Sequence, residues 1–383
     1  MSAPDAGITG AEMAALARAR ELALRARGRV SPNPLVGAVV LGGGGILAEG
    51  WHEGPGLPHA EAMALAAAGP AARGATVVCT LEPCSHHGRT PPCAEALIAA
   101  GVARVVVGCP DPLERGPGRS GGLSVLAAAG IEVALAPDEE AEACRELISD
   151  FLTHGLTGRP EVTVKMATSL DGKIATATGE SRWISGPSSR ALVHRWRADA
   201  DAVAVGIGTA LADDPSLTAR DIEGEVRQPV RVVFDTRARL PPASALVRGA
   251  GEVPVVVLAG DDAPAERTSV LADAGVRVER VAGEGSDRVL AALDALGAMG
   301  VQSLLVEGGA GLAGGLMRAG AVDRVAWFLA PMLIGGVGAP SALGGQGVRS
   351  LADAPRLGSL GVERSGDDIL VRGRLRPPAW ARG

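Results

Sequence analysis

Aromatic side chains are scarce in this sequence, which has five Trp, three Phe and no Tyr among 383 residues. The hydrophobic core must therefore be built mainly from Ala, Val and Leu. Proteins that bind single-stranded nucleic acid stack the bases on aromatic side chains, so this composition argues against such a role. A basic block is also missing, because 37 Lys and Arg residues stand against 43 Asp and Glu residues, a net charge of −6. We expect no nucleic-acid partner, although a local cationic pocket could bind one phosphate group.

Long apolar segments are missing as well. No run reaches the roughly 18 consecutive apolar residues of a membrane span, so we expect no membrane partner. The Ala-rich residues 11–29 are interrupted by Arg and Glu and predict an amphipathic helix rather than an export signal. Five Cys residues, an odd number, suit reduced thiols in a cytoplasmic protein. We therefore expect the cysteines to serve in packing or in metal binding.

Glycine and proline are abundant, and 54 Gly and 26 Pro residues predict many tight turns and glycine-lined loops. Predicted strands alternate with predicted helices in both halves of the chain, which is typical of α/β layered domains. In the first half the last predicted helix covers 138–149, and the pattern then stops in a polar stretch at 151–160. We expect one domain at 1–152 and a second at 160–383.

Histidine and cysteine are concentrated in one short segment. Seven of the eleven His and Cys residues lie between His52 and Cys93, far more than even spacing would place there. His59 opens a predicted helix, Cys84 follows a predicted strand, and Cys93 starts the next helix. One imidazole and two thiolates are three protein ligands for zinc and leave a fourth position open for water, which is the catalytic arrangement.

Glu61 stands two residues after His59 and is not needed as a ligand. It is placed to take a proton from the zinc-bound water and to pass it to a leaving amine. Zinc nucleobase deaminases carry this pattern as H-x-E followed by P-C-x-x-C. Here eight residues rather than two separate Cys84 from Cys93, and we interpret this cysteine loop as a substrate-recognition segment. A structural zinc site, with His86 or His87 as fourth ligand, is the alternative, but it leaves Glu61 without a task.

With this loop in view, the chain resembles the bifunctional deaminase–reductase family of riboflavin biosynthesis. The resembling segments of the first half are Ser31–Gly37 (SPNPLVG), Gly50–His52 (GWH), His59–Glu61 (HAE) and Leu81–Cys93 (LEPCSHHGRTPPC). Those of the second half are Lys165–Gly172 (KMATSLDG), Gly179–Ile184 (GESRWI), Leu211–Arg220 (LADDPSLTAR) and Val306–Gly309 (VEGG). The segments span both domains in the order of the family. One departure is Leu113-Glu114, where the family usually has Asn-Pro after Asp111-Pro112.

The resemblance implies a cytidine-deaminase-like three-layer domain followed by a dihydrofolate-reductase-like α/β domain. The first would remove the 2-amino group of a diaminopyrimidinone ribosylamino 5′-phosphate. The second would use NADPH to reduce the ribosyl group of the product to ribityl. In the first domain, the family pattern assigns zinc to His59, Cys84 and Cys93, proton transfer to Glu61, the pyrimidine and ribose to Asn33, His52 and His86, and the phosphate to Arg89.

In the second domain, the resemblance implies contacts to NADPH and to the sugar phosphate. The NADPH-binding residues would be Ala167, Trp183, Thr209, Asp213, Gly309, Gly311, Gly314 and Gly315. The substrate-binding residues would be Ser181, Arg197, Leu217, Arg220 and Glu307. Lys165 and Asp171 would line the site with roles that stay unassigned.

Without the family resemblance, the sequence of the second half gives weaker evidence for a binding site. Gly309–Gly314 has the spacing G-x-G-x-x-G between a predicted strand and a predicted helix, where exposed N–H groups suit an anion. No acidic residue follows at the distance that a Rossmann fingerprint requires, so we reject that fold, and simple helix packing stays an alternative. Arg197 and Arg220 suit phosphate binding, because a guanidinium donates two parallel hydrogen bonds, but solvated surface arginines would look the same.

We therefore predict a two-activity enzyme that uses zinc and NADPH, acts on a small phosphoribosylaminopyrimidine and forms a homo-oligomer. One alternative is a zinc deaminase whose second half only oligomerises. Another is a zinc-stabilised binding module without catalysis. Glycine-lined loops and paired arginines argue against the first alternative, and Glu61 argues against the second.

Overall fold

The computed structural model describes residues 7–87, 91–116, 119–224 and 226–381. The chain divides into two compact units, Met1–Leu156 and Thr157–Gly383. None of the helices in the described ranges combines the length and the hydropathy of a membrane span.

The first unit is built on a five-stranded sheet with the strand order β2-β1-β3-β4-β7. Strand β1 runs antiparallel to β2 and β3, whereas β3, β4 and β7 run parallel to one another. The strands are β1 Gly37–Gly42, β2 Gly45–Trp51, β3 Thr76–Leu81, β4 Arg104–Cys109 and β7 Glu132–Leu135, and a separate hairpin pairs β5 Arg115–Gly116 with β6 Arg119–Ser120. Val and Ala side chains of the central strands are completely buried, as the aromatic-poor composition requires.

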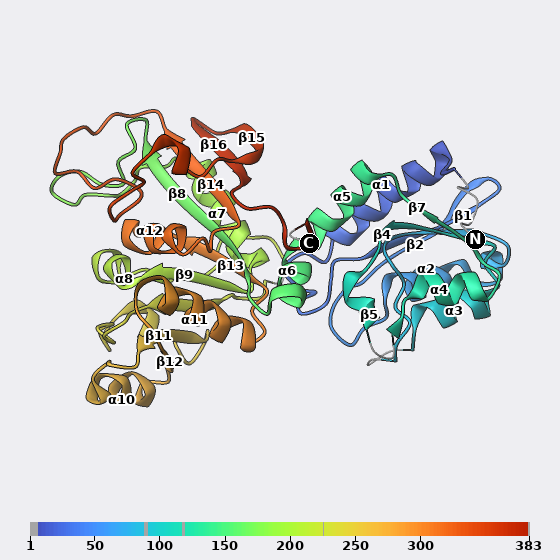
Figure 1. Ribbon diagram of the computed structural model, residues 1–383, viewed down its shortest axis with the longest axis horizontal. Helices are drawn as coiled ribbons and strands as arrows, with labels where there is room; N and C mark the ends of the chain where they lie inside the picture. Colours follow the sequence, from blue (N-terminus) through green and yellow to red (C-terminus); the bar gives the residue numbers. More distant parts are fainter. Residues whose placement is uncertain (1–6, 88–90, 117–118, 225, 382–383) are drawn as a thin grey trace. The chain divides into compact units, whose positions relative to one another are not determined.

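Helices cover both faces of this sheet (Figure 1). On one face lie α1 (Gly10–Leu24) and α5 (Asp138–Leu147), and on the other lie α2 (Ala60–Ala68), α3 (Cys93–Ala100) and α4 (Gly122–Ala128). Short 3-10 turns form at η1 Gly69–Ala72 and η2 Pro112–Glu114.

Two glycines in the sheet allow the helices to approach closely. A Cβ atom at Gly37 would lie 2.0 Å from the carbonyl oxygen of Ala19 in α1. On the other face, a Cβ at Gly50 would lie 2.3 Å from the carbonyl oxygen of Ala60 in α2. The contact at Gly50 holds the start of α2, and with it His59 and Glu61, directly against the sheet.

One sequence expectation is wrong in this unit. The single helix predicted at 138–149 is two helices, α5 and α6 (Ser149–Thr157), and α6 occupies most of the stretch predicted to be a polar break. The polar residues of this stretch suggested a linker, but the helix has a buried face, on which Leu152 is completely buried and Thr153 is 4% exposed. Tertiary packing therefore extends the helical region almost to Gly158.

The second unit contains a nine-stranded sheet with the order β12-β11-β10-β9-β13-β8-β14-β16-β15. In this order, the first seven strands, from β12 at one edge to β14, run parallel to one another. Strand β16 runs antiparallel to β14, and β15 runs antiparallel to β16. The strands are β8 Glu161–Ser169, β9 Ala202–Gly206, β10 Val230–Phe234, β11 Val255–Gly260, β12 Arg277–Val281, β13 Ser303–Glu307, β14 Arg324–Ala330, β15 Gly358–Ser365 and β16 Asp368–Arg374. The sequence predicted strands at 162–167, 202–207, 230–234, 253–258, 276–281, 303–306 and 324–329, which correspond to β8 to β14. It missed β15 and β16. Strand β15 is exposed along almost its whole length and shows no alternation of buried and exposed residues.

Helices pack on both faces of this sheet. The helices are α7 Pro187–Asp199, α8 Ile207–Asp213, α9 Ala245–Arg248, α10 Ala265–Asp273, α11 Gly285–Ala298 and α12 Ala310–Arg318, with 3-10 turns at η3 Leu351–Asp353 and η4 Ala379–Ala381. One hydrophobic core contains buried residues of α11 and α12, and a second contains residues of α8, α9 and α10. The helices predicted from the sequence near 187–198, 264–274, 286–299 and 310–319 correspond to α7, α10, α11 and α12, whereas the short helices α8 and α9 were not predicted.

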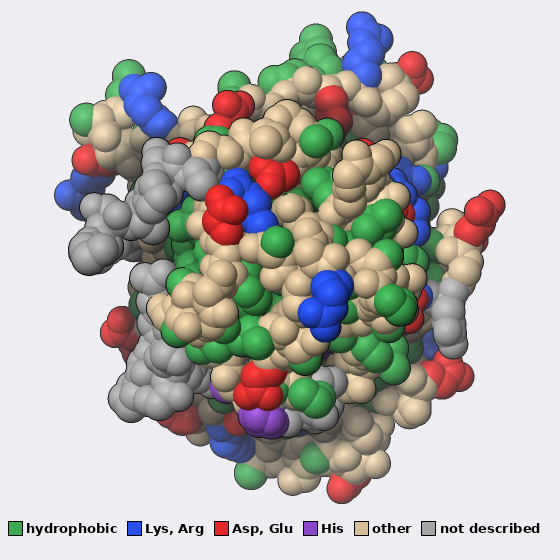
Figure 2. Space-filling model, turned by 90° about the vertical axis from the view of Figure 1, so that its right-hand side faces the viewer, with side chains coloured by type: hydrophobic (Ala, Val, Ile, Leu, Met, Phe, Trp, Pro, Cys, Tyr) green, Lys and Arg blue, Asp and Glu red, His purple; other side chains and the backbone are tan. Residues whose placement is uncertain are grey.

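One face of the first unit carries charges of both signs (Figure 2). Figure 2 shows Lys and Arg side chains separated from one another by Asp, Glu and uncharged groups over the described part of this face. Interspersed charges of this kind do not produce a broad field of one sign.

The division into two units predicts that they fold independently when the chain is cut between Thr157 and Gly158. Each piece is large enough for a core of its own, so both are expected to be soluble and to unfold cooperatively. Circular dichroism during thermal unfolding, with the intact chain as control, measures this. Aggregation of the first piece alone would contradict the prediction, because it would show that the two cores need each other.

Candidate functional site

Three predicted metal ligands converge at one end of the first sheet. His59 occupies the N-cap position of α2, Cys84 lies in the loop after β3, and Cys93 is the first residue of α3. Their ligand atoms all lie within 4.8 Å of one another. His59 Nδ1 is 3.2 Å from Cys93 Sγ and 3.6 Å from Cys84 Sγ, and the backbone N–H of Cys93 donates to Cys84 Sγ at 3.3 Å.

This geometry fits a zinc ion. Zn–S bonds of about 2.3 Å and Zn–N bonds of about 2.0–2.1 Å in a tetrahedral site place neighbouring ligand atoms roughly 3.5–3.8 Å apart. Hydrogen bonds from Cys93 and then His59 lower the pKa of the Cys84 thiol, which favours the thiolate that zinc requires. The residue types and their spacing therefore match a zinc site.

A fourth protein ligand is not part of this group. His86 Nδ1 lies 2.5 Å from Glu114 Oε1, and the side chain of His87 is 72% exposed, with its Nε2 4.0 Å from Glu95 Oε2. Neither histidine belongs to the three-residue metal group found among the described residues. The arrangement thus favours an open catalytic site over a closed structural one.

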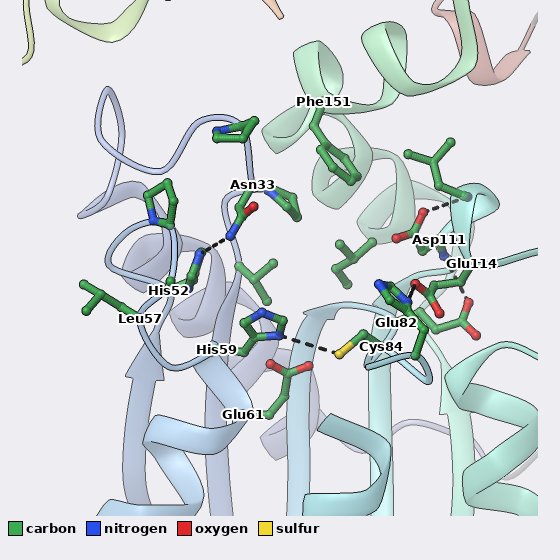
Figure 3. A pocket seen from close by; sticks show the side chains of 18 residues that line it. Asn33, His52, Leu57, His59, Glu61, Glu82, Cys84, Asp111, Glu114 and Phe151 are labelled. Carbon is green, nitrogen blue, oxygen red and sulfur yellow. Dashed lines mark hydrogen bonds and ion pairs between the residues drawn. The ribbon is translucent and has the colours of Figure 1, made fainter. Parts of the chain in front are cut away.

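Glu61 lies in the first turn of α2 and is 3% exposed. Figure 3 shows its carboxylate beneath His59 and Cys84, directed towards the same cavity. Burial raises the pKa of the Glu61 carboxyl, so the environment favours its protonated form more than water does. A carboxyl group in this position can both accept and return a proton.

His59, Cys84 and Glu61 line a cavity of about 540 Å³, and the third metal ligand, Cys93, lies beside the other two. The predicted substrate residues Asn33, His52 and His86 line it too, whereas Arg89 lies outside the described residues. His52 is held on both sides of its ring. Its Nδ1 donates to the carbonyl oxygen of Pro58 at 3.0 Å, and its Nε2 accepts from Asn33 Nδ2 at 2.8 Å. Burial lowers the pKa of His52, which agrees with a neutral imidazole that has one donor and one acceptor.

Three acidic residues and one aromatic residue of the cavity lining were not assigned to the site from the sequence. They are Glu82, Asp111, Glu114 and Phe151. Glu82 and Asp111 follow the carboxyl ends of the parallel strands β3 and β4, and that position is a signal that could have found them. The aromatic ring of Phe151 points from α6 into the cavity (Figure 3), and no local pattern reveals this placement.

In the second unit, three charged groups meet at the centre of the sheet. Lys165 on β8 and Glu307 on β13 are register partners on neighbouring strands. Arg197 of α7 donates to both oxygens of Glu307, with Nη2 2.9 Å from Oε2, and its Nη1 donates to the carbonyl oxygen of Thr218 at 3.0 Å. The side chain of Arg197 is only 13% exposed, so the interpretation as a solvated surface arginine is wrong for this residue.

The pKa values of this cluster follow from burial and charge. Burial lowers the pKa of Lys165. Burial by itself would raise the pKa of Glu307, but the hydrogen bond and the charge of Arg197, with the charge of Lys165, bring it below the ordinary value. Glu307 is therefore held as a carboxylate between two cations.

The glycines predicted to bind NADPH differ in the space around them. Gly309, with φ of 80°, caps α12, and a Cβ there would lie 2.7 Å from Thr209 Oγ1, whereas a Cβ at Gly311 would have nothing within 4 Å. This open helix start fits an anionic cofactor group. At Gly314 the packing alternative holds, because a Cβ would lie 2.0 Å from the carbonyl oxygen of Gly344. A Cβ at Gly315 would meet only side-chain atoms at 3.9 Å or more.

The other predicted site residues of the second unit lie on different loops and strands. Ser181 Oγ donates to Asp213 Oδ1 at 3.4 Å, and Trp183 is 66% exposed, with the Arg190 guanidinium 4.6 Å from its ring centre. Ala167 is half-buried on β8, and Leu217 is buried with φ of 53°. Arg220 is exposed, with its Nη1 bonded to Ser216 Oγ at 2.9 Å. No contact joins Ala167 or Leu217 to the other predicted residues among the interactions described.

Comparison with known proteins covers both units. Residues 11–109 match the family model described as the cytidine and deoxycytidylate deaminase zinc-binding region, and residues 160–371 match the model of the RibD C-terminal domain. The chain is 41% identical to the riboflavin biosynthesis protein RibD of Aquifex aeolicus, over 92% of this chain and 95% of that protein. It is 40% identical to the RibD of Escherichia coli, over 93% of this chain and 97% of that protein.

Solved structures agree with these matches. A structure of Acinetobacter baumannii RibD superposes with a TM-score of 0.82 at 37% identity and covers 96% of this chain and 99% of that one. A Thermotoga maritima protein has the same TM-score and coverage at 35% identity. The predicted fold class, a cytidine-deaminase-like domain followed by a dihydrofolate-reductase-like domain, is confirmed.

The matched reductase domain excludes a second half that only oligomerises, and the matched deaminase region excludes a binding module without catalysis. Zinc and NADPH are accordingly the cofactors of the two units. Because relatives about 40% identical over more than nine-tenths of its length carry both domains in the same order, the chain belongs to the RibD family of bifunctional deaminase–reductases of riboflavin biosynthesis.

Proposed function

We propose that the first unit hydrolyses the 2-amino group of 2,5-diamino-6-(5-phosphoribosylamino)pyrimidin-4(3H)-one, and that the second reduces the ribosyl group of the product to ribityl. The single observation that carries the proposal is the cluster of His59, Cys84 and Cys93 at a cavity that Glu61 also lines. The Thermotoga maritima protein supports the choice of substrate, because it is described as a diaminohydroxyphosphoribosylaminopyrimidine deaminase and 5-amino-6-(5-phosphoribosylamino)uracil reductase.

In the deaminase, His59, Cys84 and Cys93 would hold the zinc ion. When bound, zinc lowers the pKa of the water molecule that attacks the ring. Glu61 accepts a proton from that water and returns it to the departing amine, a role that its burial beside the cavity supports. The paired side chains of Asn33 and His52 would orient the pyrimidine and ribose, and His86 would complete this contact. Arg89 is the proposed cation for the phosphate.

In the reductase, NADPH would bind at the start of α12, against Gly309, Gly311 and Thr209, with Asp213, Trp183 and Ala167 as further contacts. The Glu307 carboxylate would accept hydrogen bonds from sugar hydroxyls. Arg197 is already bonded to Glu307 and Thr218, so we assign it to holding this carboxylate in place. Arg220 is exposed and is the proposed phosphate-binding cation, with Ser181 and Leu217 beside the sugar phosphate.

We also propose that the enzyme is a homo-oligomer located in the cytoplasm, as the sequence predicts. Sedimentation equilibrium of the full chain measures the oligomeric state. A molecular mass of about 38 kDa at all concentrations would contradict an oligomer.

Two substitutions separate metal binding from proton transfer in the first unit. Cys84→Ser removes one thiolate ligand and is expected to lose zinc, measured by atomic emission. Glu61→Gln is expected to retain zinc and to lose deamination by at least about 10²–10⁴-fold, because general acid–base catalysis contributes that much. Ammonia release by Glu61→Gln at a rate near that of the unchanged enzyme would show that Glu61 has another role.

The buried ion pair between Arg197 and Glu307 predicts that Arg197 contributes more to the stability of the protein than the exposed Arg220 does. Arg197→Met leaves the carboxylate of Glu307 buried without its hydrogen-bonded cation and is expected to lower the free energy of unfolding by about 3 kcal/mol. The matched control Arg220→Met removes an exposed charge and is expected to change the free energy of unfolding by less than about 0.5 kcal/mol. Urea unfolding followed by Trp fluorescence measures both, and equal effects would argue against a special role of the pair.

The order of the two reactions gives a further prediction. A site built to hydrogen-bond a ring carbonyl rejects an exocyclic amine, because its buried polar groups are left unpaired. Glu61→Gln enzyme is therefore expected to bind NADPH but not to oxidise it when given the diamino substrate. With the deaminated compound it is expected to oxidise NADPH at the full rate, measured by absorbance. Oxidation with the diamino substrate would show instead that reduction can come first.

A further inference from the structure

A buried carboxylate that the reaction has not yet used contacts the cysteine loop. Glu114 ends the turn η2, lines the cavity, and has a side chain that is only 4% exposed. Its Oε2 accepts hydrogen bonds from the backbone N–H of Ser85 at 3.2 Å and from Ser85 Oγ at 3.0 Å. Its Oε1 lies 2.5 Å from Nδ1 of His86.

The neighbouring carboxylates of the cavity have different partners. Glu82 accepts from the backbone N–H groups of Asp111 at 3.0 Å and Leu123 at 3.1 Å, so it holds the loop before α4. Glu61 lies beside the metal ligands. Glu114 differs from both, because it contacts two successive residues immediately after the ligand Cys84.

The contact with His86 determines which edge of the imidazole faces the carboxylate. Nδ1 of His86 lies in ion-pair contact with Glu114 Oε1, although the two groups are not aligned as a hydrogen bond. Nδ1 is therefore the ring nitrogen that faces Glu114, and Nε2 lies on the other side of the ring. The two hydrogen bonds to Ser85 fix the backbone from which the ring projects.

We propose that Glu114 is a positioning residue of the deaminase, which orients His86 towards the substrate through Nδ1. The inference rests on the proposed function, in which His86 contacts the pyrimidine and ribose.

Glu114→Gln tests this role with little change in shape. The amide oxygen can still accept from Ser85, but the substitution removes the carboxylate oxygen that lies against Nδ1 of His86 and its negative charge. We expect the KM for the diamino substrate to rise about tenfold, because His86 would lose its positioned hydrogen bond to the substrate. The kcat of ammonia release is expected to change less than twofold. Zinc content and NADPH oxidation with the deaminated compound are expected to stay unchanged in the same protein.

A matched substitution and a double-mutant cycle complete the experiment. Glu95→Gln alters an exposed carboxylate near His87, outside the cavity, and is expected to leave the KM unchanged. His86→Ala is expected to raise the KM by itself. If Glu114 acts through His86, adding Glu114→Gln to His86→Ala produces no further rise.

Each other outcome overturns the inference in a distinguishable way. An unchanged KM in His86→Ala would remove the proposed substrate role of His86 and the role of Glu114 with it. A raised KM in His86→Ala, combined with no effect of Glu114→Gln or with effects that multiply in the double variant, would overturn the role of Glu114 alone. Loss of zinc or of soluble protein in Glu114→Gln would show that Glu114 supports the fold of the metal loop instead.

Discussion

Close packing of α2 against the first sheet is the constraint on which the deaminase site depends. One ion can bind an imidazole and two thiolates only if the start of α2, the loop after β3 and the start of α3 meet within a few ångströms. Gly50 has no side chain between the sheet and α2, so the helix backbone lies directly on the strand. Any side chain at this position would displace His59 and Glu61 together, because both belong to the first turn of the helix.

Both units position their functional residues in the same way. In each unit, parallel strands end at one edge of a sheet, and the loops that follow carry the polar residues. Glu82 and Asp111 follow β3 and β4 in the first unit, and Glu307 ends β13 in the second. The sheet is a rigid frame of buried Val and Ala, so the groups at its edge are held in place without aromatic side chains in most of the core.

Buried carboxylates in these sites differ according to their partners. Glu61 has its pKa raised by burial, which suits a group that must both accept and release a proton. Glu307 has its pKa lowered by two neighbouring cations, which suits a permanent hydrogen-bond acceptor. Glu114 is bonded to Ser85 and faces His86, so its environment orients other residues. The same side-chain type thus serves three purposes in one chain.

The sequence by itself determined the chemistry of the first site, because the ligands belong to short motifs at predictable places. His59 and Glu61 start a helix and Cys93 starts another, so local patterns and spacing were enough to name them. The family resemblance extended this to both domains and to their cofactors. Only the tertiary structure decided which distant residues meet. Arg197 and Glu307 are 110 positions apart, Phe151 reaches the cavity from a helix that looked like a linker, and Gly314 proved to serve packing against Gly344. These contacts depend on how strands and helices pack in space, and a linear pattern carries no record of that packing.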